Sequence, residues 1–200
     1  MTTPGARRSF TRAELEAFRD AEVPDRLPGA DDPPLALLFV GINPGLWTAA
    51  TSTHFAHPGN RFYPALLRAG ILTERIDPAA GMTDADRAAL RSLGIGITNV
   101  VPRATAKASE LRDDELREGA VRLSSLVERT RPRVVAIAGI TAYRTAFGER
   151  RAAPGRQPAD LHGAQLWVVP NPSGLNAHET TETLAAAYAE PARAAGLLPG

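Results

Sequence analysis

Four short, largely apolar runs constrain the fold of this 200-residue chain more than any other feature. A run of about four to eight such residues between turn residues is typical of a strand that is buried on both faces. A glycine or a proline directly follows each run, so each predicted strand has a defined end. The runs cover residues 35–40, 97–101, 133–138 and 166–169.

Helical patterns fill the intervals between these runs. Thr11 and Glu14 have the spacing of a capping box, which predicts a short helix that ends near Arg19. We expect Pro191 to bend or end the last helix. Because strands that alternate with helices favour parallel pairing, the sequence predicts an α/β fold: a three-layer α/β/α sandwich with a central, mainly parallel four-stranded sheet. The other predicted helices cover residues 60–69, 84–93, 113–130, 140–147 and 179–195.

The length of the chain suits one domain. We interpret residues 1–10 as a flexible N-terminal tail, residues 11–200 as a single domain, and the proline-rich stretch 20–34 within it as a linker between elements. There is no signal-peptide pattern and no run of about 20 apolar residues, so we expect no membrane contact. A cytoplasmic location is the expectation that follows.

Composition excludes several kinds of chemistry. The chain has no cysteine, which rules out disulfides, thiolate metal sites, iron–sulfur clusters and cysteine nucleophiles. His54 and His57 have no acidic residue nearby, so we expect no metal site. We also expect no cofactor, since neither the Rossmann glycine fingerprint nor a Walker lysine is present. The formal charge of +1 neither indicates nor excludes a nucleic-acid partner.

Two uncharged segments follow the first and last predicted strands. Residues 41–60 contain no acid, lysine or arginine, and we expect a long structureless loop, which in a compact domain is usually functional. Residues 171–178 are the second such segment, up to Glu179. Because the carboxyl ends of parallel strands share one edge of the sheet, the two segments are expected to line a common pocket.

These segments carry a family resemblance. Residues 41–45 (GINPG), 54–62 (HFAHPGNRF) and 171–175 (NPSGL) resemble the signature of mismatch-specific uracil/thymine-DNA glycosylases, a family of the uracil-DNA glycosylase superfamily. The resemblance covers roughly residues 35–188, with the three motifs in the family's order. Three separated motifs at matching strand ends are more specific than any one of them.

The resemblance implies a role for each candidate site residue. Asn43 is the catalytic candidate, because its amide oxygen can position a water beside the sugar carbon. Phe55 is implied to stack on a base extruded from double-stranded DNA, and Leu175 to fill the vacated space. The candidate substrate-binding residues are Ile42, Thr48, Phe55, Asn99 and Asn171, and the candidate DNA-binding residues are Ser173, Gly174, Leu175, Asn176 and His178.

Two positions leave alternatives open. Some family members carry an arginine after the wedge that reads the opposite strand, but this chain has Ala177. Asn176 and His178 are the candidates to replace it, and the preference for an opposite guanine stays open. Asn99 either contacts the base or a water, or it caps the strand end.

The resemblance implies a monofunctional glycosylase that hydrolyses the N-glycosidic bond of uracil in DNA, at G:U mismatches and in other damaged pyrimidines. Its partner would be double-stranded DNA with a flipped uracil, and we expect a monomer in the bacterial cytoplasm. The alternative is a non-catalytic damaged-DNA or nucleotide-binding domain on the same fold. Asn43 favours the enzyme, because a binding domain has no need of an amide that positions water.

Overall fold

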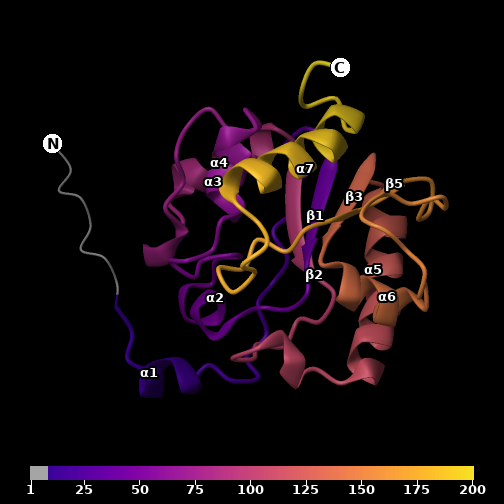
Figure 1. Ribbon diagram of the computed structural model, residues 1–200. Helices are drawn as coiled ribbons and strands as arrows, with labels where there is room; N and C mark the ends of the chain where they lie inside the picture. The colour runs from indigo at the N-terminus through magenta and orange to yellow at the C-terminus, as the bar shows by residue number, and fades with distance from the viewer. Residues whose placement is uncertain (1–8) are drawn as a thin grey trace, which may run out of the picture.

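The computed structural model of the protein describes residues 9–200, and it contains a central five-stranded sheet (Figure 1). Residues 1–8 of the expected N-terminal tail lie outside the described residues. The strand order is β2-β1-β3-β5-β4, and all neighbours pair in parallel except β4 with β5. The strands are β1 (Leu37–Gly41), β2 (Ile95–Asn99), β3 (Val134–Ala138), β4 (Gly155–Arg156) and β5 (Gln165–Val169).

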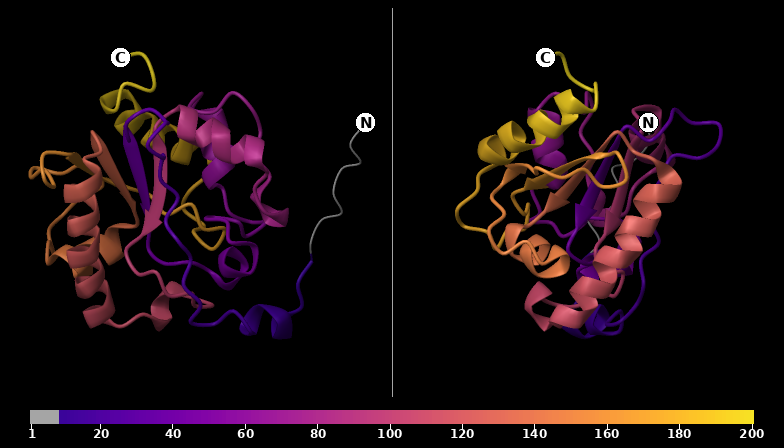
Figure 2. Two further views of the ribbon diagram at one scale, coloured as in Figure 1. Left: turned by 180° about the vertical axis from the view of Figure 1, so that it is seen from behind. Right: turned by 90° about the vertical axis from the view of Figure 1, so that its right-hand side faces the viewer.

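Helices cover both faces of the sheet, which confirms the predicted α/β class. Helices α3, α4 and α7 pack on one face, and α5 and α6 pack on the other (Figures 1 and 2). The α-helices are α1 (Arg12–Glu16), α2 (Leu46–Thr51), α3 (Phe62–Arg68), α4 (Asp84–Ser92), α5 (Asp113–Thr130), α6 (Ile140–Phe147) and α7 (Thr181–Ala194), with short 3₁₀ helices at Pro78–Ala80 and Ala108–Glu110.

The central strand β1 is apolar throughout because it is buried on both faces. Leu37 and Phe39 belong to the core beneath α3 and α7, whereas Leu38 and Val40 belong to the core beneath α5 and α6. Successive side chains of a strand point to opposite faces, so alternate residues supply the two cores. This explains why the sequence shows continuous apolar runs rather than an apolar–polar alternation.

Four details differ from the sequence-based expectations. Strand β2 spans Ile95–Asn99 rather than residues 97–101, because Val100 and Val101 leave the sheet to follow the segment after β1. The sheet has a fifth strand, β4, whose two residues are too short for a recognisable pattern. Helix α7 continues through Pro191, which lies in its last turn.

The fourth difference is in residues 41–60, which are not a structureless loop. They include α2, which Gly45 precedes and which ends at Ser52 in a left-handed conformation (φ 48°). Leu46 and Ala49 of α2 pack in a small cluster with Val23 and Ala104. A six-residue helix of this kind is too short to show a helical period in the sequence.

The proline-rich stretch after α1 covers the outer edge of β2. The backbone groups of Arg26 and Ile97 exchange two hydrogen bonds, of 2.8 and 2.7 Å. Covering an edge strand in this way satisfies its free backbone groups. The predicted capping box of Thr11 and Glu14 is confirmed at the start of α1. No helix within residues 9–200 combines the length and the apolar character that a bilayer crossing requires.

Candidate active site

A cavity of about 460 Å³ lies at the carboxyl ends of the parallel strands. Gly41, Asn99 and Ala138, the last residues of β1, β2 and β3, line it, and Asn171, which follows β5, does so too. Strand β2 lies on one side of β1, and the next strand along the chain, β3, lies on the other side. The order in which strands are added to the sheet therefore reverses at β1. Ligands of open α/β sheets bind at this point.

Asn43 lies in the cavity wall directly after β1, with its amide nitrogen fully engaged. Nδ2 donates to Oγ1 of Thr105 (2.7 Å) and to the carbonyl oxygens of Arg103 and Pro44 (both 3.1 Å). Because a carbonyl oxygen only accepts, these partners fix which end of the amide is NH₂. No group among residues 9–200 donates to Oδ1 of Asn43, and this acceptor is left for the cavity.

The segment after β2 holds Asn43 in this place. The N–H groups of Val101 and Thr105 donate to the carbonyl oxygens of Ile42 (2.9 Å) and Pro44 (3.1 Å). The two segments therefore run side by side beyond the ends of their strands. Thr105 in turn donates its hydroxyl proton to the carbonyl of Lys107 (2.8 Å), so its oxygen is free to accept from Asn43.

Phe55 forms an aromatic wall of the cavity. Its ring stacks on Phe62 with the centroids 4.0 Å apart and an angle of 24° between the planes. Phe55 has a φ of 56°, a left-handed conformation that costs energy in a residue other than glycine and is often found at functional sites. The ring is partly exposed, and it can stack on a planar ligand.

Asn99 is buried at the end of β2 and contacts His54. Its Nδ2 lies 3.1 Å from Nδ1 of His54, and its Oδ1 lies over Gly41, where a Cβ would be only 2.4 Å away. Nε2 of His54 lies 3.1 Å from the carbonyl oxygen of Pro24. Burial lowers the pKa of His54 below its ordinary value.

Two more predicted substrate-binding residues line the same cavity. Thr48 projects from α2 and is buried, and Ile42 is half-buried beside the end of β3. A Cβ at Gly139 would lie 3.1 Å from Cδ1 of Ile42, and Gly139 has a φ of 126°. A glycine at this position therefore lets Ile42 and Asn171 approach each other across the end of β3.

The 171–178 segment forms a tight loop with an apolar tip. Oδ1 of Asn171 accepts from the N–H of Ser173 (3.0 Å), and the side chain of Asn176 donates back to the carbonyl of Asn171 (3.1 Å). Leu175, at the tip, is 87% exposed, which is more than any other large hydrophobic residue among those described. Gly174 passes so close to the 41–60 segment that a Cβ would lie 2.6 Å from the carbonyl oxygen of Gly59.

Arg61 holds this loop, a role that was not predicted from the sequence. Its guanidinium donates to the carbonyl oxygens of Ser173 and Asn176 (both 2.8 Å) and to that of Glu179. The backbone N–H of Arg61 also donates to the carbonyl of Pro172 (3.0 Å). Arg61 lies within a predicted motif, but nothing in its spacing indicates carbonyl partners more than 100 residues away.

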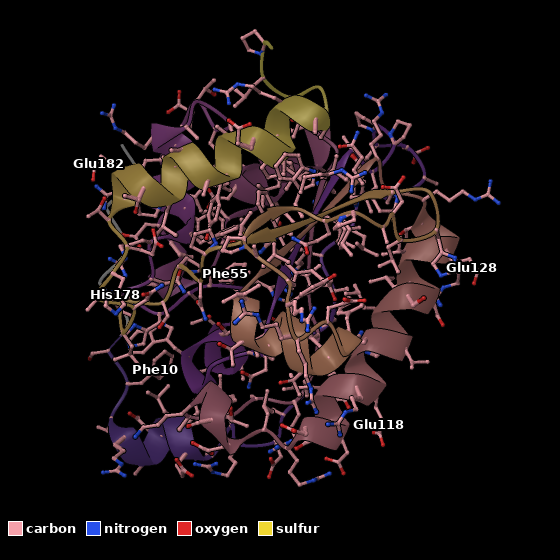
Figure 3. The ribbon with its side chains drawn as sticks, turned by 45° about the vertical axis from the view of Figure 1, so that its right-hand side comes forward. Phe10, Phe55, Glu118, Glu128, His178 and Glu182 are labelled. Carbon is pink, nitrogen blue, oxygen red and sulfur yellow. The ribbon has the colours of Figure 1, made fainter. Side chains whose placement is uncertain are left out.

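The structure brings together most of the predicted site residues. His178 is one exception, because it is exposed and does not line the cavity; Figure 3 shows it near the edge of the molecule in that view and Phe55 nearer the middle. Asn176 is half-buried and braces the loop, and its side chain contacts Asn171. Cavity residues without a predicted role include Thr105, His54 and Lys107, which is exposed.

The charges around the cavity restrict its chemistry. Within the described part of the chain, no aspartate or glutamate lines it, and Lys107 is its one lysine or arginine. Residues 9–200 contain no group of three or more histidine, cysteine or acidic side chains that could hold a metal ion. Besides amide, hydroxyl and backbone groups, the described cavity wall therefore offers only the imidazoles of His54 and His57 and the ammonium group of Lys107.

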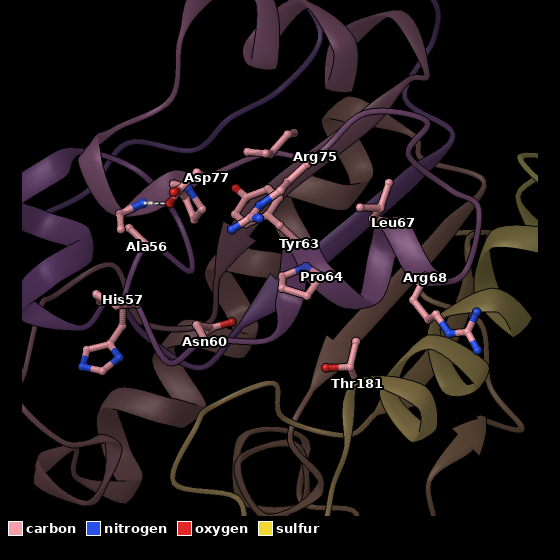
Figure 4. Close-up of a pocket in the computed structure, with 14 residues that line it drawn as sticks. Ala56, His57, Asn60, Tyr63, Pro64, Leu67, Arg68, Arg75, Asp77 and Thr181 are labelled. Atoms are coloured by element: carbon pink, nitrogen blue, oxygen red, sulfur yellow. Dashed lines mark hydrogen bonds between the residues drawn. The ribbon is translucent and has the colours of Figure 1, made fainter. Parts of the chain in front are cut away.

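A second cavity, of about 550 Å³, shares His57 and Asn60 with the first (Figure 4). The guanidinium groups of Arg68 and Arg75 point in different directions there, so they do not form a common anion site. Neither the strand ends nor the predicted catalytic residue reaches this cavity. The candidate active site is therefore the smaller cavity.

Comparison with known protein families places the site within a matched region. The model of the uracil DNA glycosylase superfamily matches residues 28–191, which include every strand and the whole cavity wall.

Proposed function

The chain belongs to the uracil DNA glycosylase superfamily, and from this premise we propose that it is a mismatch-specific uracil-DNA glycosylase of the uracil/thymine type. Membership supports a hydrolase that acts on N-glycosyl bonds of DNA in repair. The proposal adds the substrate, uracil in a G:U mismatch, and a monofunctional reaction that leaves an abasic site for base excision repair.

The observation that carries the proposal is the orientation of Asn43. Its amide nitrogen is bound to the protein, its oxygen is left for the cavity, and the described cavity wall contains no carboxylate. An amide cannot take a proton from water near neutral pH, but it can hold a water in line with the sugar carbon. The reaction is therefore dissociative: the C1′–N1 bond breaks first, and its electron pair leaves with uracil as the N1 anion. The held water then adds to the oxocarbenium-like sugar, and the proton that it loses neutralises the uracil anion.

The base would lie between the aromatic wall and the strand ends. Phe55 stacks on its face, and Ile42 and Asn171 contact its edges from the ends of β1 and β5. Thr48 closes the side of the pocket from α2, and Asn99 contacts the edge of the base from β2. A cavity of about 460 Å³ is within the usual size range of small-ligand sites.

The 171–178 loop would hold the duplex open. Leu175 enters the space that the base vacates, because an exposed apolar side chain at a rigid loop tip can replace a stacked base. Ser173 and the N–H of Gly174 contact the phosphate beside the flipped nucleotide. Asn176 and His178 lie where the opposite strand would pass, and Asn176 acts through the loop that it braces.

Excision assays on four matched fluorescent substrates test this function. Oligonucleotides that carry G:U, A:U, G:T or single-stranded uracil are treated with enzyme and then with alkali, which cuts abasic sites. We expect the fastest release of uracil from G:U and strand breaks only after alkali. Binding without excision of any base would support the non-catalytic alternative and contradict the proposal.

A further inference from the structure

His54 is a buried polar residue that the proposed reaction does not use. Its side chain is 2% exposed, and both ring nitrogens have a partner. A buried polar side chain costs free energy unless its polar atoms are hydrogen-bonded. A histidine whose two ring nitrogens are both paired beside a cavity can fix the orientation of the groups that it binds.

The partners of His54 determine where its proton lies. The carbonyl oxygen of Pro24 only accepts hydrogen bonds, so the Nε2 that faces it (3.1 Å) must carry hydrogen. In a neutral ring the other nitrogen, Nδ1, is then an acceptor. The burial that lowers the pKa of His54 keeps the ring neutral.

The proton on Nε2 also determines the orientation of Asn99. Only the NH₂ end of the Asn99 amide can donate to Nδ1 (3.1 Å), so Oδ1 must point the other way. On that side Oδ1 lies over Gly41 and close to Phe55, in the wall of the cavity. No group among residues 9–200 donates to this oxygen. The cavity thus contains a second oriented acceptor, in addition to Oδ1 of Asn43.

Pro24 is held rigidly enough to act as the reference point. Two residues further along the chain, Arg26 exchanges two backbone hydrogen bonds with Ile97 of β2. Asp25 accepts a hydrogen bond from Thr98 of the same strand. A fixed carbonyl, a buried ring and an amide therefore form one chain of hydrogen bonds that ends in the cavity.

We propose that His54 is a positioning residue that selects the base, because it fixes the Asn99 amide with its oxygen toward the cavity. An acceptor at this point favours pyrimidines with a proton on N3, which uracil and thymine have. It repels cytosine, whose N3 is itself an acceptor. This inference rests on the proposed function, which supplies a flipped pyrimidine as the ligand.

The kinetic test compares His54→Leu, which removes both hydrogen bonds, with His54→Gln, which keeps a donor and an acceptor. His162→Gln is the matched control, because His162 is an exposed histidine outside the cavity. We expect His54→Leu to slow single-turnover excision of uracil from G:U about tenfold, the factor of one lost hydrogen bond. In His54→Leu the ratio of cytosine excision (from A:C) to uracil excision should rise at least about tenfold. His54→Gln should partly restore both the rate of uracil excision and the preference for uracil.

A double-mutant cycle separates positioning from general damage to the fold. If His54 acts through Asn99, the losses caused by His54→Leu should disappear in an Asn99→Ala background. A loss of the same size in both backgrounds would overturn the proposal.

A measurement on the free protein separates this inference from the proposed function. In ¹⁵N-labelled protein we expect a neutral His54 with hydrogen on Nε2 and a coupling across the hydrogen bond from Nδ2 of Asn99 to Nδ1. A ring with hydrogen on Nδ1 would overturn the inference even in an active enzyme. An inactive wild type with the expected spectrum would contradict only the proposed function.

Discussion

The side-chain nitrogen of Asn43 donates to the hydroxyl oxygen of Thr105 at 2.7 Å, across the ends of two neighbouring strands. Thr105 is buried, and its own proton is donated to the carbonyl of Lys107. The direction of every hydrogen bond in this chain is therefore determined. As a result Asn43 presents an acceptor, and not a donor, to the cavity, which is the arrangement that a water-positioning amide requires.

The exposed tip of the 171–178 loop gives the first prediction. Leu175→Ala should slow excision of uracil from a duplex about tenfold or more, but leave excision from a single strand nearly unchanged, because only a duplex has a stack to fill. Val121→Ala is the control, since Val121 is also an exposed apolar residue but lies on α5. Equal losses on both substrates would show that Leu175 does not act as a wedge.

The arginine beneath this loop gives the second. Arg61→Met removes the donors to three carbonyl oxygens, so the loop should become mobile and duplex excision should fall about tenfold or more. Limited proteolysis should cut near residues 173–179 in this variant and not in Arg68→Met, which changes the exposed last residue of α3, the helix that follows Arg61. An unchanged cleavage pattern would refute the anchoring role of Arg61.

The buried histidine predicts a pH dependence of stability. Burial lowers the pKa of His54 in the folded protein. The hydrogen bond to Pro24 and the charge of Asp25 oppose this shift, and the charge of Arg26 adds to it, so the unfolded chain binds this proton more tightly. The contribution of neutral His54 to the free energy of unfolding is complete above about pH 6.5, and it is lost as the pH falls toward the lowered pKa. We expect the free energy of unfolding, measured with urea at about pH 7.5 and about pH 5, to fall more between these pH values for the wild type than for His54→Gln. Equal losses would mean that His54 titrates normally.

The single lysine predicts the fate of the abasic site. A lyase reaction needs an amine that forms a Schiff base. A dry or cationic environment activates such an amine by lowering its pKa. Lys107 lines the cavity but is exposed, and no other lysine or arginine among the described residues lines it. Borohydride added during turnover should therefore trap only traces of a protein–DNA adduct. An adduct comparable in amount to the product, and absent in Lys107→Ala, would assign a lyase activity to this residue.

Strand ends, family motifs and most of the fold could be predicted from the sequence because each depends on local pattern. The apolar runs fix β1 and β3 since both faces of these strands are buried, and GINPG places Asn43 directly after β1. What could not be predicted depends on contacts between distant segments. Helix α2 forms because two of its side chains pack against the stretch before β1 and the segment after β2.

The same reason explains the residues that sequence reasoning missed. Arg61 and Thr105 act through partners 112 and 62 positions away. Gly41 is needed because the side chain of Asn99 crosses it, a contact that follows from the β1–β2 register and has no sequence signal. The orientation of Asn99 depends on Pro24, in a stretch that was expected to be only a linker.

The most direct test of the account measures two quantities for Asn43→Ala on the same G:U duplex. Single-turnover excision should fall by about 100-fold or more, because the water is no longer held in line with the sugar carbon. The dissociation constant for the duplex should change less than about threefold, because Asn43 acts on water and not on the DNA backbone. Thr105→Val, which removes one partner of the amide, should give an intermediate rate. Excision at the wild-type rate by Asn43→Ala would contradict the account.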